Sequence, residues 1–373
     1  MTSARSKIGI WILLLRLCVV VSGWITLFPH ASLAAEDVLA AADQVQWQFE
    51  DPGRIVTVGD LHGDFNKFVD ILLTAGLIDA SGKWIGGTTH LVQLGDINGK
   101  GEDTRLIMDL IINLEGQARE AGGRVHTLLG NHDLKVVWGD LYSTTEQEVR
   151  GFKDFAETKP ADGSETGAMK RERLQKGFLA ALRGESSYAK WVRSRNMVVK
   201  IGTRLFSHGG FRKWISRVDI AAYNATARAW LAYYQGVGPK PPKGSNWVVF
   251  SDLSSAWDRK LLDLDLKRDA LDKIRQRLGV EEIFLGHKPA PISSELDRRE
   301  VLEIYEKVYM CDTGISDRRD GTGSAVIVEG ERIAILNDVA KHPDRKRVRD
   351  SIKLSGRLRS PGCVLYGQYV FGG

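Results

Sequence analysis

Residues 54–63 read RIVTVGDLHG, and this stretch decides the predicted fold. Its first five residues form a short β-branched run that ends at Gly59 and Asp60, which is typical of a strand. Phe65, Phe68 and Leu72 then recur at helical spacing. The sequence therefore predicts a strand, a loop that carries the polar residues Asp60 and His62, and a helix.

The same pattern occurs again along the chain. Apolar runs at 90–94, 124–129, 204–207 and 282–285 lead into Gly95-Asp96, Gly130-Asn131-His132, His208-Gly209-Gly210 and Gly286-His287. A run at 307–312 ends in Asp312-Thr313-Gly314, and 324–336 predicts a hairpin. Strands alternating with helices predict an α/β fold whose strand-end loops meet at one edge of a sheet.

Six residues of these loops are oxygen or nitrogen ligands: Asp60, His62, Asp96, Asn131, His208 and His287. They suffice for two divalent metal ions if the ionised Asp96 carboxylate bridges both. Asp60 and His62 project the same way if the chain stays extended. A set without thiolate suits Mn, Fe or Zn better than Ca or Mg. The sequence predicts a dinuclear metallohydrolase, and four of the eight histidines, His30, His90, His126 and His342, are interpreted as satisfied or surface residues.

The chain of 373 residues is expected to form one catalytic domain at about 50–336. The strand pattern lapses between about 138 and 195, which predicts a helical cap insertion beside the site. Residues 337–373 form a basic extension that is expected to be solvated, with phosphate steering or attraction to acidic surfaces as the alternative.

Composition excludes several classes of protein. A hydrophobic content of 43% indicates neither disorder nor a polytopic membrane protein. The formal net charge of +5 falls to +2 when the three basic residues Arg5, Lys7 and Arg16 of the N-terminal segment are left out, since no acidic residue precedes Glu36. No nucleic-acid partner is therefore expected.

The N-terminal segment, residues 1–34, has a charged start, an apolar stretch and small residues at its end, which predicts a cleaved secretory signal peptide. The expected location is secreted or periplasmic. An uncleaved signal anchor is the alternative and would place the protein at a membrane. Cys311 and Cys363 then remain, either as one bridge or as two unpaired thiols.

The order of the motifs GDxHG, GD, GNH, HGG and GH resembles the metallophosphoesterase superfamily, the calcineurin-like enzymes, and within it the phosphoprotein phosphatase group. Residues 117–123 and 138–142, on either side of GNH, resemble the bacterial-type Shewanella-like phosphatases. The resemblance implies a four-layer fold, a central β-sandwich of mixed sheets flanked by helices. It also implies phosphomonoester hydrolysis by a metal-bridging hydroxide. One metal would be held by Asp60, His62 and Asp96, and the other by Asp96, Asn131, His208 and His287.

Three further residues take catalytic roles by this resemblance. His132 would act as general acid, and Lys100 and Arg259 would bind the phosphate of a phosphorylated substrate. The second motif departs from the family pattern GDxxDRG, because Gly99 replaces the acidic residue that orients His132 and Lys100 replaces an arginine. Lysine keeps the charge but loses the two-pronged geometry of arginine. Asp133, in place of the usual glutamate, is a smaller change.

Three functions remain open on the sequence. The first is a dinuclear-metal phosphomonoesterase, a phosphoprotein phosphatase-like hydrolase. The second is a nucleotide polyphosphate hydrolase, since a lysine at position 100 resembles some ApaH-like enzymes, or a phosphodiesterase. The third is a metal- or phosphate-binding protein whose catalysis is weakened by Gly99.

Overall fold

The computed structural model describes residues 45–160, 163–264, 267–295, 297–316 and 321–356. The predicted signal peptide at 1–34 and Cys363 lie outside these residues. Within the described ranges, no helix combines the length and the apolar content needed to cross a membrane.

Two mixed sheets form the centre of the described structure. The six-stranded sheet has the order β1 (Gln48–Phe49), β5 (Val198–Ile201), β6 (Arg204–Ser207), β7 (Glu282–Leu285), β11 (Val308–Met310) and β10 (Leu302–Ile304). The five-stranded sheet has the order β13 (Arg332–Leu336), β12 (Ala325–Glu329), β2 (Arg54–Val58), β3 (His90–Gln93) and β4 (Arg124–Thr127). β2, β3 and β4 run parallel, whereas β12 pairs antiparallel with both β2 and β13. The predicted strands and the 324–336 hairpin are therefore present.

A buried apolar cluster joins the two sheets face to face. Ile55, Val92 and Val326 come from the five-stranded sheet, and Phe206 and Phe284 come from the six-stranded sheet. The rings of Phe206 and Phe284 stack at 4.9 Å. Apolar side chains that interdigitate between two sheets are the mark of a sandwich, so the expected β-sandwich of mixed sheets is confirmed.

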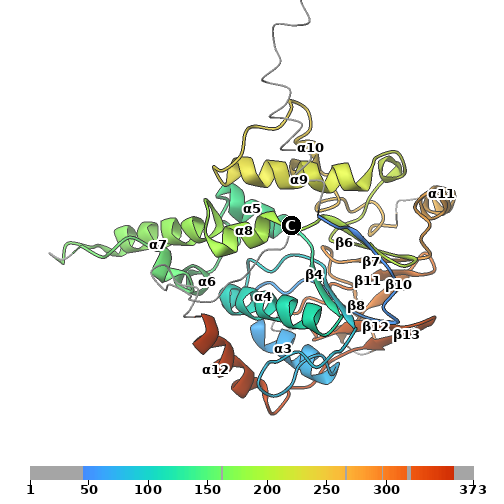
Figure 1. Ribbon diagram of the computed structural model, residues 1–373, viewed down its shortest axis with the longest axis horizontal. Coiled ribbons are helices and arrows are strands. Elements are labelled where there is room, and N and C mark those ends of the chain that lie inside the picture. The colour runs from blue at the N-terminus through green and yellow to red at the C-terminus, as the bar shows by residue number, and fades with distance from the viewer. Residues whose placement is uncertain (1–44, 161–162, 265–266, 296, 317–320, 357–373) are drawn as a thin grey trace, which may run out of the picture. The chain divides into compact units, whose positions relative to one another are not determined.

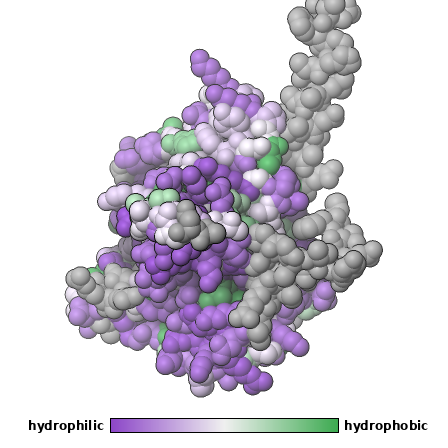
Figure 2. All heavy atoms as spheres, turned by 90° about the vertical axis from the view of Figure 1, so that its left-hand side faces the viewer, coloured by the Kyte–Doolittle hydropathy of each residue, from purple (hydrophilic) through white to green (hydrophobic). Residues whose placement is uncertain are grey.

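Helices flank the sandwich (Figure 1). They are α3 (Phe65–Thr74), α4 (Thr104–Glu120), α5 (Asn131–Trp138), α6 (Glu146–Arg150), α7 (Gly167–Leu182), α8 (Ser187–Arg193), α9 (Ile220–Tyr234), α10 (Trp247–Phe250), α11 (Arg268–Leu278) and α12 (Arg345–Gly356), with 3-10 turns η1 (Lys153–Phe155) and η2 (Lys213–Ser216) and a small ribbon of β8 (Ile292–Ser293) and β9 (Arg298–Arg299). The expected helical stretch between 138 and 195 contains α6, α7 and α8. Figure 2 shows that the face around the α7 end is mostly hydrophilic, with small separate apolar patches.

Helix α12 differs from the solvated extension expected for the C-terminal region. Val348 is fully buried and Ile352 is 3% exposed, and α12 packs against α3 and α4. Arg345 pairs with the buried carboxylate of Asp70 at 2.8 Å. Arg349 also pairs with Asp103, at 2.6 Å, so two of the basic side chains of this helix contact the domain, which a count of charges along the sequence could not reveal.

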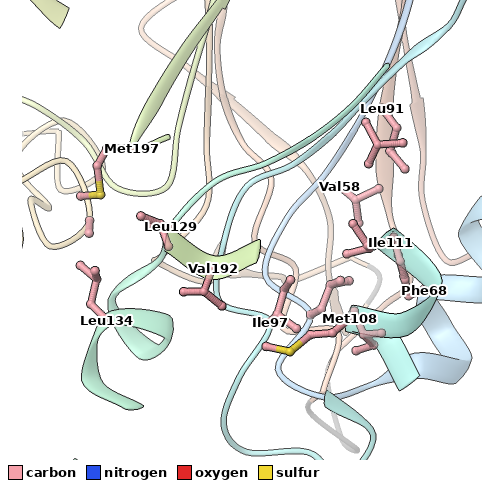
Figure 3. Packing of buried hydrophobic residues seen from close by; sticks show 14 of the residues in the cluster. Val58, Phe68, Leu91, Ile97, Met108, Ile111, Leu129, Leu134, Val192 and Met197 are labelled. Atoms are coloured by element: carbon pink, nitrogen blue, oxygen red, sulfur yellow. The ribbon is translucent and has the colours of Figure 1, made fainter. Parts of the chain in front are cut away.

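The strand-end loops are joined through their backbones. The N–H groups of Leu61 and His62 donate to the carbonyl of Asp96 at 3.1 and 2.8 Å. Between the polar residues, Ile97 and Leu129 enter the apolar core, and Figure 3 shows Ile97 beside Met108 of α4. The loop with Asp96 is thus held by the burial of Ile97 and by hydrogen bonds to the neighbouring loop that carries His62.

Asp133 links the second loop, which follows β3 and carries Asp96, to the third loop, which follows β4 and carries Asn131. Its carboxylate accepts hydrogen bonds from the backbone N–H groups of Gly130, Asp96, Ile97 and Asn98 at 2.8–3.2 Å and from the Asn98 side-chain amide at 2.7 Å. The residue is 5% exposed. A single buried carboxylate therefore satisfies five donors that water does not reach.

We expect Asp133→Ala to lower the free energy of unfolding by about 3 kcal/mol or more, because unsatisfied buried donors cost roughly 1–3 kcal/mol each. Urea denaturation measures the change. Asp272→Ala, at an exposed position of α11, is the control and should be neutral. Equal unfolding midpoints for Asp133→Ala and the unmodified protein would show that this carboxylate does not hold the loops.

Candidate active site

Two groups of side chains, buried except for the partly exposed His132, share Asp96. His62 Nε2 lies 3.7 Å from Asp96 Oδ2 and 3.8 Å from Asp60 Oδ2. His208 Nε2 lies 3.4 Å from Asp96 Oδ1, and its Nδ1 lies 3.8 Å from Asp60 Oδ1. The ligand atoms of His62, Asp96 and His132 lie within 4.8 Å of one another, and so do those of Asp60, Asp96 and His208. Asp96 thus occupies the central position that the sequence assigned to it.

Asn131 and His287 complete the cluster. The side-chain oxygen of Asn131 lies 3.2 Å from His208 Nε2 and 3.1 Å from His287 Nδ1. The backbone N–H of His287 donates to Asp60 Oδ1 at 2.9 Å. All six sequence-predicted ligands therefore meet at one place, although they span residues 60 to 287.

Backbone carbonyls orient two of the imidazoles. His62 Nδ1 lies 3.0 Å from the carbonyl of Asn98, and His208 Nδ1 lies 2.9 Å from the carbonyl of Leu94. A carbonyl only accepts, so each Nδ1 is the donor and each Nε2 faces the carboxylates. This is how histidine ligands are usually held for a metal ion.

Burial sets the protonation of the rings and carboxylates. It lowers the pKa of His62 and of His287 to about 3, so both rings are neutral and have a lone pair to offer. Burial, together with the charge of Asp312, raises the pKa of Asp60 well above its usual value. Negative charges crowded in a dry site favour the neutral, protonated form of a carboxyl group.

The pKa of His208 is shifted in the opposite direction from those of His62 and His287. Burial alone would lower its pKa, but the charges of Asp96 and Asp60 raise it to about 10. A proton on this ring and a cation therefore compete for the same two carboxylates. The buried carboxylates, the imidazoles with fixed Nδ1 and the Asn131 oxygen form a donor set that fits divalent cations. Asp60 lies equally close to both histidines, 3.8 Å from His62 Nε2 and 3.8 Å from His208 Nδ1, whereas the resemblance assigns it with His62 to one ion. The division between the ions stays a prediction.

Three more predicted residues border the cluster. Lys100 Nζ lies 2.8 Å from His62 Nε2, and the Arg259 guanidinium Nε donates to His287 Nε2 at 3.2 Å. His132 donates its backbone N–H to Asp96 Oδ1 at 2.8 Å, and its ring Nε2 lies 4.0 Å from Asp96 Oδ2. One acid–base side chain and two basic side chains thus surround the potential cation sites.

The glycines that precede these residues allow close approach. A Cβ atom on Gly130 would lie 2.1 Å from Asp96 Oδ1, and one on Gly286 would lie 2.3 Å from Asp60 Oδ1. Such contacts are far inside van der Waals separation. The recurrent Gly-polar pairs in the sequence therefore reflect carboxylates packed against backbone.

Several site residues adopt left-handed backbone conformations. The φ angles are 43° at His62, 55° at Asp96, 65° at Lys100 and 71° at His287. Non-glycine residues in this region are uncommon and gather at functional sites. The positive φ at His62 also corrects the assumption that Asp60 and His62 lie on an extended chain. A turn brings them together instead.

The sequence patterns did not indicate that Asp133 and Asp312 belong to the site. The family pattern indicates only a small change at Asp133, whereas its carboxylate binds the backbone of two loops. Asp312 is 1% exposed and accepts a hydrogen bond from Gly314 N–H at 2.8 Å. Its position after an apolar strand, in a polar triplet ending in glycine, is the same signal that marked the other loops.

The match to a family model covers residues 53–291, more than half of the chain, and the model describes the calcineurin-like phosphoesterases. A curated relative, Shewanella-like protein phosphatase 2 of Arabidopsis thaliana, is 29% identical over 277 residues, which cover 68% of this chain and 70% of that protein. Shewanella-like protein phosphatase 1 of Plasmodium berghei is 26% identical over 186 residues, covering 50% of this chain and 46% of that protein.

Solved structures share the fold. A cold-active protein tyrosine phosphatase of a psychrophilic Shewanella species has a TM-score of 0.63 at 23% identity, covering 80% of this chain and 84% of that chain. A protein serine/threonine phosphatase from Saccharomyces cerevisiae has a TM-score of 0.51 at 16% identity, covering 85% and 92%. With this fold, this cluster and this family match, the chain belongs to the calcineurin-like phosphoesterase family and is a metal-dependent phosphoric ester hydrolase.

Proposed function

We propose that the chain is a phosphomonoesterase of the phosphoprotein phosphatase type that works with two divalent cations around Asp96. The observation that carries this proposal is that two buried histidines flank the Asp96 carboxylate, His62 Nε2 at 3.7 Å from Oδ2 and His208 Nε2 at 3.4 Å from Oδ1. Metal ions that share one carboxylate, about 3.5–4 Å apart, are the arrangement of two-metal phosphatases.

The proposed ligands of these cations are Asp60, His62, Asp96, Asn131, His208 and His287. When bound, the cations lower the pKa of a water molecule and bind phosphoryl oxygens. The nitrogen and oxygen donors favour Mn, Fe or Zn. The carbonyls that hold His62 and His208 keep Nε2 of each ring directed at the carboxylates, so the chain itself fixes the direction of both ligands.

Lys100 and Arg259 are proposed to bind the phosphate. Lys100 contacts His62 and Arg259 contacts His287, so the two basic side chains lie against two different histidines of the cluster. A phosphate held at the cluster would then have one ammonium and one guanidinium within reach. Charge-assisted hydrogen bonds of this kind are the strong ones in phosphate recognition.

His132 is proposed as the general acid that protonates the leaving oxygen. Burial lowers the pKa of His132, while the charge of Asp96 opposes that shift. The negative charge of a bound phosphate favours the protonated ring further. The Asp96 carboxylate accepts the backbone N–H of His132, which fixes the start of α5 and the ring that it carries.

The substrate class is proposed from the relatives. Their names describe protein phosphatases, and one solved structure is named a protein tyrosine phosphatase. We therefore favour a phosphorylated protein, with a small phosphoester next. A nucleotide polyphosphate hydrolase or phosphodiesterase is the second candidate and is favoured by Lys100 in place of arginine. A catalytically weakened phosphate-binding protein is the third, because of Gly99.

We also propose that residues 1–34 direct the protein to a secreted or periplasmic location, with membrane anchoring as the alternative. The catalytic domain is assigned to 50–336, with the insertion at about 138–195 beside the site.

A panel of p-nitrophenyl phosphate, phosphopeptides and dinucleoside polyphosphates, assayed with added Mn, separates the three candidate functions. The proposal predicts turnover of the first two substrates. Preferential cleavage of the dinucleoside compounds would favour the second candidate, and no hydrolysis by metal-loaded protein would leave only the third.

Asp96→Asn should abolish both metal binding and activity, because it removes the negative charge that both ligand groups share. His132→Asn should retain the metal and lower kcat by about 10²–10⁴-fold, the usual contribution of a general acid. Metal analysis of the purified variants and steady-state kinetics measure both effects. His342→Asn, at a partly exposed histidine outside the cluster, is the control. Unchanged metal content in Asp96→Asn would contradict the shared-ligand assignment.

N-terminal sequencing of the mature protein checks the proposed location. Cleavage near Ala34 is the expected outcome. A mature protein that starts at Met1 would contradict the cleaved signal peptide.

A further inference from the structure

The loop that follows β3 and carries Asp96 and Lys100 forms hydrogen bonds with the segment of residues 143–148. The backbone N–H of Lys100 donates to the carbonyl of Ser143 at 2.8 Å. The hydroxyl of Thr145 donates to the carbonyl of Gly101 at 2.6 Å. The backbone N–H of Gly99 donates to Glu148 Oε1 at 2.8 Å. Three successive loop residues thus contact one short segment that includes the start of α6.

Glu148 is the buried member of that segment. Its side chain has no solvent exposure, and Oε1 also accepts the hydroxyl of Thr104 at 2.6 Å. Its second oxygen, Oε2, is buried without a hydrogen-bond partner in the described part of the chain. Burying a carboxylate with one oxygen unsatisfied costs free energy. A purely structural glutamate at this place would be a poor choice, which points to a functional reason for keeping it.

The loop needs such support because of its backbone. Gly99 and Lys100 have φ angles of 86° and 65°, two consecutive residues in the left-handed region. For lysine this conformation is costly and persists only where the surroundings enforce it. The N–H groups of these two residues are the ones bound by Glu148 and Ser143. Their hydrogen bonds therefore fix the direction in which the Lys100 side chain leaves the loop.

The surroundings of Gly99 explain why the carboxylate that contacts this loop comes from Glu148 and not from residue 99. A Cβ atom there would lie 2.8 Å from His132 Nδ1 and 3.5 Å from Ser143 Cβ. A carboxylate side chain at residue 99 does not fit in this arrangement. The acidic residue missing from the motif has no room beside His132, whereas Glu148 places a carboxylate on the opposite, backbone side of the same residue.

We propose that Glu148 is a positioning residue that acts through the Gly99 backbone to direct Lys100 at the substrate phosphate. The proposal rests on the phosphate-binding role of Lys100 under the proposed function. Glu148 does not touch the substrate in this account. The segment 143–148 thereby links the helical region after α5 to phosphate binding in the site.

The test compares Glu148→Ala, Glu148→Gln and the matched control Glu146→Ala, an exposed glutamate two residues away on α6. Binding of inorganic phosphate to the Mn-loaded proteins is measured by calorimetry, and KM and kcat are measured with p-nitrophenyl phosphate. We expect Glu148→Ala to weaken phosphate binding and raise KM about tenfold, the effect of one charge-assisted contact, with unchanged metal content. Glu148→Gln keeps an acceptor for Gly99 N–H, so it should return to within about threefold of the unmodified protein.

A double-mutant cycle separates positioning from a general loss of structure. If Glu148 acts through Lys100, the pair Glu148→Ala and Lys100→Ala should bind phosphate no more weakly than Lys100→Ala alone, since neighbours in one network are not additive. Additive losses, or unchanged phosphate affinity in Glu148→Ala, would overturn the inference.

Thr145→Val serves if Glu148→Ala does not fold. It removes the hydroxyl bond to Gly101 and the hydrogen bond that the same oxygen accepts from Glu148 N–H. Phosphate binding should weaken in the same direction, by about threefold; no weakening there would count against the inference. A protein that binds phosphate through this network yet hydrolyses no substrate would contradict the proposed function while leaving the positioning inference standing.

Discussion

The active site depends on one buried carboxylate that is not itself a predicted ligand. Asp133 collects the backbone N–H groups of the Asp96 loop and of Gly130, and so fixes the distance between the second and third loops. Asp96, at the centre of the cluster, is presented by a backbone that Asp133 holds. Removing water from such a place makes each hydrogen bond stronger and each missing one more costly.

Close packing of backbone and carboxylates is the second constraint. Gly130 and Gly286 leave space that a Cβ atom would fill, against Asp96 and Asp60 respectively. The left-handed conformations of His62, Asp96 and His287 add strain to the same few residues. The apolar anchors beneath the loops, such as Ile97, offset that strain by burial in the core. Hydrogen bonds to the backbone N–H groups of the Asp96 loop and burial of Ile97 therefore act together to hold this conformation.

Much of this arrangement could be predicted from sequence, and the reason is periodicity. Apolar runs that end in Gly-Asp or Gly-His marked β2, β3 and the loops after them, and parallel strands bring such loops to one edge. The sequence did not predict features that depend on contacts between distant segments. The turn at His62, the docking of α12 through Val348 and the contact of Glu148 with Gly99 depend on three-dimensional neighbours, which have no local pattern in the sequence.

The central claim is that the cluster around Asp96 binds two divalent cations. Anomalous diffraction from crystals of the Mn-loaded protein with bound phosphate tests it most directly. We expect two anomalous peaks about 3.5–4 Å apart, on either side of the Asp96 carboxylate and both in contact with the phosphate. A single peak, or peaks away from Asp96, would contradict it.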